Sequence, residues 1–72
     1  MDDHDQTWAG FWCSLLSPIL FGEVAERDAH RFLRKLAREQ HLFPDGRRRK
    51  ASLSTLRRKW RTYRQGGFAA LA

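Results

Sequence analysis

The stretch from Ser52 to Gln65, SLSTLRRKWRTYRQ, constrains the fold more than any other part of the chain. At about 100° per residue on a helix, its apolar side chains gather on one side and its hydroxyl and arginine side chains on the other. The apolar side comprises Leu53, Leu56, Trp60 and Tyr63, and the polar side comprises Ser54, Arg58, Arg61, Thr62 and Gln65, with Arg57 and Arg64 on the flank. Ser52 has a side-chain oxygen that can cap the helix start, and Gly66–Gly67 stops it. The stretch therefore predicts an amphipathic helix that buries one side against the rest of the chain.

Length and cysteine content limit what that rest can be. The chain has 72 residues, which suffice for one small domain with a modest core, so about three short helices are the ceiling without metal ions or disulfides. Its one cysteine, Cys13, excludes an intramolecular disulfide and fits a reducing compartment. We therefore expect a single all-α domain of three to four helices spanning residues 1–72, with residues 1–6 disordered.

An apolar stretch from Trp8 to Phe21 raises the question of a targeting segment. Acidic rather than basic residues precede it, unlike in a secretory signal, and it is too short to span a membrane. Its apolar residues instead recur at the spacing of a core helix, which Asp5 or Thr7 can cap: Trp8, Phe11, Trp12, Leu15 and Leu16. Because a proline disfavours the helical conformation of the preceding residue, Pro18 is expected to stop this helix near Ser17.

A second helical pattern runs from about Glu23 to Gln40, with an inner stripe of Ala25, Ala29, Phe32, Leu33 and Leu36. Glu23 precedes Arg27 by four residues, which is the favourable order for a helical ion pair. The stretch from Phe43 to Gly46 then suits a type I turn, since proline stands at its second position and glycine at its fourth. The expected core comprises Trp12, Phe32, Leu36, Leu56, Trp60 and Tyr63.

The charges are divided unequally along the chain. Residues 1–26 carry a formal charge of −5 and residues 27–72 one of +11, and a basic half of this size predicts a polyanionic partner. Arg47, Arg48, Arg49 and Lys50 stand in a row. Because four consecutive bases cannot share one face of a regular element, we interpret them as a mobile arm that follows DNA phosphates. The alternative is a solvated loop without a ligand.

The basic helix is the predicted reader of DNA bases. Hydroxyls and an arginine in its first two turns, with more arginines behind them, suit a helix in the major groove of double-stranded DNA. Together with the basic run, the predicted DNA-binding residues are Arg47, Arg48, Arg49, Lys50, Ser54, Thr55, Arg57, Arg58, Arg61 and Thr62. The alternative is a surface helix whose charges are merely solvated.

Helix, turn and basic helix follow the helix-turn-helix plan, with residues 41–51 as an extended turn. The run from Ser52 to Leu71, SLSTLRRKWRTYRQGGFAAL, resembles the N-terminal helix-turn-helix domain of bacterial DDE-type transposases and integrases. In that family a Ser/Thr-Leu helix carrying a Trp runs into Tyr-Arg-x-Gly-Gly-x-x-Ala-Leu. The stretch from Leu15 to Gly22 resembles the Leu-x-x-Pro-x-Leu-x-Gly segment before the motif's first helix. One departure is that the Trp stands four residues after the Leu, where the family often has three.

The resemblance implies a function in DNA transposition and recombination. A domain of this family binds transposon ends in the bacterial cytoplasm, at the nucleoid, and a catalytic domain with three carboxylates follows it. Since this chain stops at Ala72, before any such domain, we expect it to lack strand-transfer activity and not to be an enzyme.

The residues offer no competing chemistry. His4, His30 and His41 with Cys13 lack zinc-ligand spacing, and no glycine-rich phosphate loop follows a strand, so neither a metal ion nor a cofactor is expected. The alternative function is a protein-interaction module. In that interpretation the Trp8/Phe11/Trp12 helix binds a partner protein, and the basic half only aids solubility.

Overall fold

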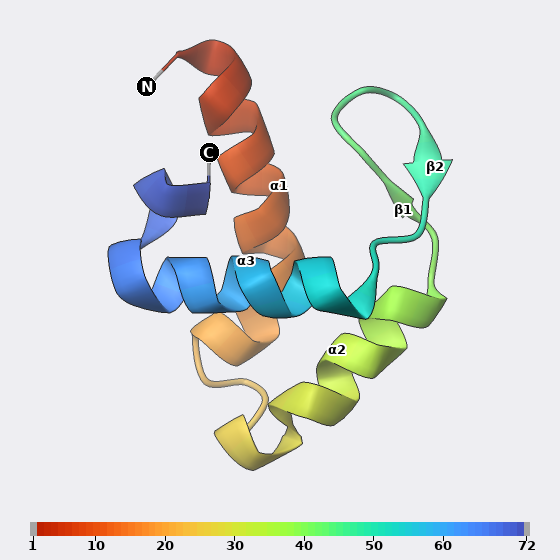
Figure 1. Cartoon of the computed structure of the whole chain (residues 1–72), viewed down its shortest axis with the longest axis vertical. Helices are drawn as coiled ribbons and strands as arrows, with labels where there is room; N and C mark the ends of the chain where they lie inside the picture. Colours follow the sequence, from red (N-terminus) through yellow and green to blue (C-terminus); the bar gives the residue numbers. More distant parts are fainter. Residues whose placement is uncertain (1, 72) are drawn as a thin grey trace.

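The start and the end of the last helix follow from its terminal residues. The computed structural model describes residues 2–71, and its helix α3 spans Leu53–Gly66 (Figure 1). The Ser52 side chain accepts a hydrogen bond from the Thr55 backbone N–H at 3.1 Å, which is the predicted cap. Gly67, with a φ of 71°, ends the helix and donates its N–H to the Tyr63 carbonyl. The predicted basic helix is thus confirmed, together with its cap and its stop.

The first helix begins earlier than its sequence predicts. Helix α1 spans Asp3–Leu20, and residues 3–6, which were expected to be disordered, form its first turn. Its cap is Asp2, whose carboxylate accepts a hydrogen bond from the Asp5 N–H at 2.8 Å. The prediction that Asp5 or Thr7 caps this helix is therefore wrong. Asp2 supplies the same chemistry one turn earlier, since an aspartate oxygen can reach the N–H three residues ahead.

Pro18 lies inside α1, so the prediction that it stops the helix is also wrong. Proline has no N–H for the Ser14 carbonyl, a loss that costs about 3 kcal/mol in a helix interior. Here the loss falls in the last turn of the helix, so only one hydrogen bond near its end is missing. Continuing the helix places Ile19 and Leu20 against the core, which favours it. The Pro18 carbonyl then accepts from the Val24 N–H at 2.8 Å and closes the following turn.

The second helix is shorter than predicted. A 3-10 turn, η1 (Glu26–Asp28), leads into helix α2 (Ala29–Arg38). Gly22 has a φ of 85° and Ala25 is extended, so the chain between them is a loop. The helix predicted to begin at Glu23 therefore has no helical turn at residues 23–25, which the structure describes as a loop.

The acidic residues near this loop pair with other partners than predicted. Among residues 2–71, no ion pair joins Glu23 to Arg27, and Arg27 Nε instead lies 3.9 Å from the Asp28 carboxylate. Glu26 pairs across the fold with Arg64 of α3 at 3.3 Å. Without the first helical turn, the predicted local ion pair does not form, and an ion pair between distant elements is present instead.

A β-hairpin occupies the extended turn between α2 and α3. Strand β1 (His41–Leu42) pairs antiparallel with strand β2 (Arg48–Arg49). The predicted turn is confirmed, because the Gly46 N–H donates to the Phe43 carbonyl at 2.9 Å. Gly46 has a φ of 85°, as expected after a type I turn in a three-residue hairpin loop. The prediction of a mobile arm over Arg47–Lys50 is corrected, because the turn folds its middle two bases into a strand.

The core lies where α3 crosses α1 and contacts α2 (Figure 1). Its buried side chains are Ala9, Trp12, Leu16, Leu33, Leu36, Phe43, Ala51, Leu56 and Leu71. The predicted core members in this set are Trp12, Leu36 and Leu56, and those at its edge, only partly buried, are Phe32, Trp60 and Tyr63. The apolar side of α3 therefore faces inward as predicted, although its largest residue, Trp60, lies at the rim of the core.

The predicted all-α class is confirmed. No helix within residues 2–71 is long and apolar enough to cross a membrane.

The chain after α3 folds back onto the core. A 3-10 turn, η2 (Phe68–Leu71), contacts both α1 and α3, and Leu71 has no exposed surface. A Cβ atom at Gly66 would lie 2.7 Å from the Ala70 Cβ, so glycine is required for this close approach. The two adjacent glycines are therefore required for different reasons. Gly67 adopts a positive φ, and Gly66 leaves room for the Ala70 side chain.

Replacing Ser52 by alanine tests the cap directly. The substitution removes the acceptor for the Thr55 N–H, and we expect the free energy of unfolding to fall by about 0.5–2 kcal/mol. Chemical denaturation followed by circular dichroism measures it. Ser54→Ala is the matched control, since Ser54 is exposed inside the helix and should change the stability by less than about 0.5 kcal/mol. Equal effects of the two substitutions would contradict the cap.

Candidate nucleic-acid interface

The outward side of α3 presents polar side chains to solvent. Leu56 is fully buried, and this fixes the rotation of the helix about its axis. Ser54, Arg58 and Arg61 fall on the opposite side and are all exposed, as is Gln65. The structure therefore brings together three of the predicted DNA-binding residues on one accessible surface.

Three other predicted residues of α3 lie on its flanks. Thr55 and Thr62 are half-buried. The Thr55 hydroxyl accepts a hydrogen bond from the Ser52 hydroxyl at 2.9 Å, so it belongs to the cap. Arg57 is exposed but turns toward α2, where its Nη2 lies 2.9 Å and 3.0 Å from the two ring nitrogens of His30. These three are therefore placed beside the outward surface rather than at its centre.

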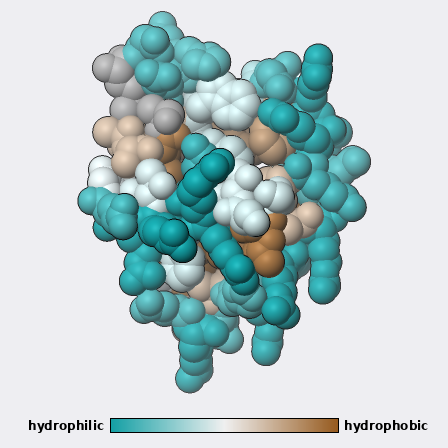
Figure 2. Space-filling model, viewed as in Figure 1, coloured by the Kyte–Doolittle hydropathy of each residue, from teal (hydrophilic) through white to brown (hydrophobic). Residues whose placement is uncertain are grey.

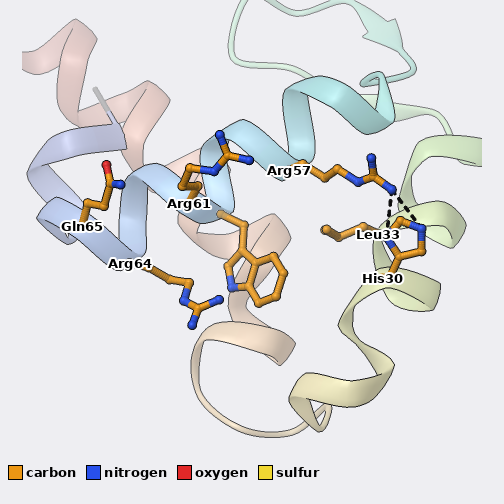
Figure 3. Close-up of a pocket in the computed structure, with 7 residues that line it drawn as sticks. His30, Leu33, Arg57, Arg61, Arg64 and Gln65 are labelled. Carbon is orange, nitrogen blue, oxygen red and sulfur yellow. Dashed lines mark hydrogen bonds between the residues drawn. The ribbon is translucent and has the colours of Figure 1, made fainter.

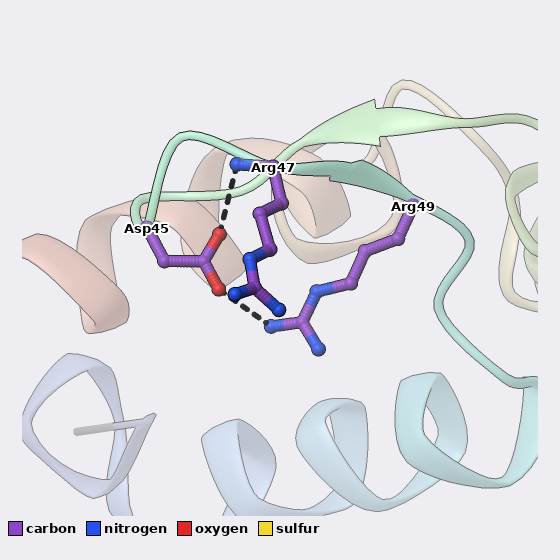
Figure 4. A network of polar contacts seen from close by, with 3 residues as sticks. All are labelled: Asp45, Arg47 and Arg49. Carbon is purple, nitrogen blue, oxygen red and sulfur yellow. Dashed lines mark hydrogen bonds and ion pairs between the residues drawn. The ribbon is translucent and has the colours of Figure 1, made fainter.

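The four bases of the hairpin are exposed, but they are not equivalent. Asp45 accepts a hydrogen bond from the Arg47 N–H at 3.0 Å and forms an ion pair with Arg49 at 3.3 Å (Figure 4). The Arg49 guanidinium also lies 4.2 Å from the centroid of the Phe43 ring. Arg48 is opposite Leu42 in the strand pairing, and alternation along a strand directs it to the other face from Arg49. The Arg49 side chain is thus held in place by a carboxylate and an aromatic ring.

An aromatic cluster anchors the hairpin to α1. The Phe43 ring lies 4.7 Å from Phe11, 5.9 Å from Trp12 and 6.2 Å from Trp8, measured between ring centroids. Tilted and edge-on pairs at such distances are favourable beyond the area they bury. The hairpin is therefore seated on the first helix, and the aromatic face of that helix is in contact with the chain's own loop.

The hairpin and the first turn of α3 adjoin one another. A cavity of about 190 Å³ is lined by Arg49 and Lys50 from the hairpin side and by Ser52 and Thr55 from the helix side, with aromatic residues beneath. Figure 2 shows hydrophilic side chains over most of the face that carries α3. The basic hairpin therefore adjoins the capped first turn of α3.

Two bases of α3, Lys59 and Arg64, are not among the predicted DNA-binding residues. Of these, Lys59 turns inward. Its Nζ lies 5.2 Å from the centroid of the Trp12 ring. Partial burial lowers the pKa of Lys59 from its ordinary value, and the neighbouring charge of Arg58 lowers it further. This cation therefore contacts the core rather than the outward surface.

A groove of about 430 Å³ between α2 and α3 is the feature that sequence reasoning missed. It is lined by His30, Leu33, Arg57, Trp60, Arg61, Arg64 and Gln65 (Figure 3). His30 and Arg57 are far apart in the sequence, and no spacing rule joins a histidine of one helix to an arginine of another. The basic content of α3 was visible in the sequence, whereas the second wall of the groove was not.

Comparison with known proteins does not identify the chain. No protein-family model, no curated protein and no solved structure matches it. Within residues 2–71, no three histidine, cysteine or acidic side chains gather where they could hold a metal ion. The proposal of DNA binding therefore depends on the surface itself.

Proposed function

We propose that the chain is a double-stranded DNA-binding domain in which α3 enters the major groove and the hairpin lies along the adjacent backbone. The observation that carries the proposal is the joint exposure of Ser54, Arg58 and Arg61 on α3, opposite the buried Leu56. A helix fits the major groove, and an arginine such as Arg58 can there donate two hydrogen bonds to guanine O6 and N7. The bases of the hairpin supply phosphate contacts, which set the register of a protein on DNA without reading sequence.

The biological process is proposed on the resemblance of Ser52–Leu71 to transposase and integrase domains. On this basis the domain recognises transposon-end DNA during transposition and recombination, at the bacterial nucleoid. It is not itself an enzyme in this proposal, and its partner besides DNA is a catalytic domain, as the resemblance implies. The length and basicity of α3 and the Gly66–Gly67 stop are consistent with that resemblance.

A protein-interaction module has weaker support. That alternative requires the aromatic face of α1 to be available to a partner. Trp8, Phe11 and Trp12 instead contact Phe43 of the chain's own hairpin, and Trp12 is 5% exposed. The hairpin therefore already covers part of the face that a partner would need.

A binding titration tests the proposed function. A preferred duplex is first selected from a random library, and its affinity is then compared with that of a scrambled duplex at two salt concentrations. We expect the preferred duplex to bind more tightly at both, and both affinities to fall with salt because phosphate contacts release counterions. An absence of binding to either duplex at low salt would refute the proposal.

Arg58→Lys tests whether α3 reads bases. Lysine keeps the positive charge but loses the planar fork that guanine recognition uses. We expect the preference for the selected over the scrambled duplex to fall by about 1–3 kcal/mol, with nonspecific affinity nearly unchanged. Paired titrations with the two duplexes measure both quantities.

Arg38→Lys is the matched control for that substitution. Arg38 is exposed at the end of α2 and lies outside the predicted DNA-binding set. It should change neither the preference nor the nonspecific affinity. If Arg58→Lys behaves like Arg38→Lys, this position does not read bases.

A further inference from the structure

The groove between α2 and α3 concentrates positive charge around an apolar floor. Arg57, Arg61 and Arg64 come from α3 and His30 comes from α2 (Figure 3). Trp60 and Leu33 supply apolar lining. The groove has a volume of about 430 Å³, so a single tetrahedral oxyanion fits inside it. Arginine forks arranged around a small site are the groups that proteins use to bind phosphate.

The three arginines differ in how far their charge is already balanced. Arg64 pairs with Glu26 at 3.3 Å, and its guanidinium lies 5.1 Å from the centroid of the Trp60 ring. Within residues 2–71, neither Arg57 nor Arg61 has a carboxylate within ion-pair distance. The uncompensated charge of the groove therefore belongs to Arg57 and Arg61.

His30 holds Arg57 at the mouth of the groove. The Arg57 Nη2 lies 2.9 Å from Nε2 and 3.0 Å from Nδ1 of the imidazole, so it donates to whichever ring nitrogen carries no proton. Desolvation lowers the pKa of His30 from its ordinary value, and the charges of Arg57 and Arg34 lower it further. His30 is an exposed residue, so its desolvation is only partial. The guanidinium of Arg57, 2.9 Å from the ring, is a direct cause of the lowered pKa. The neighbouring charge therefore favours the neutral imidazole, which accepts a hydrogen bond from Arg57.

We propose that this groove binds one tetrahedral oxyanion through Arg57 and Arg61, and that binding is accompanied by protonation of His30. An anion between the two guanidiniums offsets the charges that disfavour the imidazolium. It also gives Arg57 a stronger acceptor than the imidazole, which frees a ring nitrogen to take a proton. The identity of the anion as a DNA backbone phosphate rests on the proposed function, whereas the site itself does not.

The sign of the pH dependence follows from these charges. The bound anion favours the charged imidazole, so the pKa of His30 is higher in the complex than in the free protein. The affinity for the anion therefore rises as the pH falls from the pKa of His30 in the complex toward the pKa of His30 in the free protein. The charged groups that face His30 are Arg57 and Arg34, with Arg61 and the Glu26-paired Arg64 across the groove.

Sulfate is the appropriate first probe, because its own charge does not change between about pH 5 and 8, within which histidine titrates. Nuclear magnetic resonance follows the imidazole signal of His30 across this range in sodium sulfate and in sodium chloride at matched ionic strength. We expect sulfate to raise the pKa of His30 relative to chloride. Equal titration curves in the two salts would overturn the proposal, because the groove would then respond only to ionic strength.

Two substitutions separate the roles of the residues. Arg57→Gln should weaken sulfate binding by about tenfold or more, since a charged hydrogen-bond donor is removed. His30→Gln keeps an acceptor for Arg57 but cannot take a proton, so it should bind sulfate equally at about pH 5.5 and 7.5, while the parent binds more tightly at the lower pH. A pH dependence that survives His30→Gln would overturn the assigned role of His30.

Arg38→Gln is the control for nonspecific charge, because it removes the same charge from an exposed position outside the groove. It should leave sulfate binding and the His30 titration unchanged. If it weakens sulfate binding as much as Arg57→Gln does, the groove is not a site. If sulfate binds as expected but no duplex does, the site stands and the proposed function fails. If DNA binds without moving the His30 signal, the proposed function stands and the groove does not hold a phosphate.

Discussion

Replacing Leu56 by alanine is expected to lower the free energy of unfolding by about 2–5 kcal/mol. Leu56 has no exposed surface and lies on the inner side of α3. The substitution removes buried apolar atoms and leaves a cavity that the surrounding helices can fill only in part. A chain of 72 residues is stable by roughly 4–10 kcal/mol, so the decrease is a large fraction of the total. Urea denaturation followed by tryptophan fluorescence measures it.

Leu42→Ala is the matched control, since it deletes the same atoms from a side chain that is 59% exposed on the hairpin. It should change the stability by less than about 0.5 kcal/mol. Similar unfolding midpoints for the two variants would mean that the rotation of α3 is misassigned. Trp60 is a poorer test than the sequence suggests, because it is only partly buried and borders two grooves.

Removing the charges of Arg47 and Arg48 together should weaken binding to every DNA sequence alike. Each DNA phosphate that the protein no longer neutralises reduces the slope of log affinity against log salt by roughly 0.9, so the slope of the double alanine variant should be smaller by about 1.8. Arg49 is left in place because Asp45 already neutralises part of its charge. Titrations of the selected and the scrambled duplex at several salt concentrations give the slopes.

Arg31 and Arg38 provide the control pair for this experiment, since both are exposed on α2 and outside the predicted DNA-binding set. Their double alanine variant changes the net charge equally, so any weakening it causes reports the general field of the protein. A hairpin effect no larger than this one would remove the hairpin from the interface. A weakening confined to the selected duplex would instead make Arg47 and Arg48 base-reading residues.

Features that depend on residues close together in the sequence were predicted correctly. The Ser52 cap needs only an oxygen three residues before an N–H, and the turn closed by Gly46 needs only proline and glycine at fixed positions. The exposed surface of α3 was predicted in the same way, because helical periodicity places Ser54, Arg58 and Arg61 opposite Leu56. These interactions span a few residues, so their geometry is set by backbone rules alone.

Where a local preference competes with burial, sequence reasoning failed. Pro18 should end a helix that is considered by itself, but continuing α1 packs Ile19 and Leu20 against the core, and the hydrogen bond that proline removes lies at the end of the helix. The predicted arm over Arg47–Lys50 failed for a similar reason. Packing of Phe43 on the aromatic residues of α1 seats the hairpin, and two of the four bases then pair as a strand.

The sequence by itself determined the boundaries of α3, the polar side of that helix and the concentration of positive charge in the second half of the chain. Only the tertiary structure decided that Leu71 returns to the core and that His30 meets Arg57 to form the wall of a groove. Periodicity reports which side of one helix is apolar. It carries no information about which residue of a distant helix lies opposite, because that depends on crossing geometry that the packed side chains of all the helices set together.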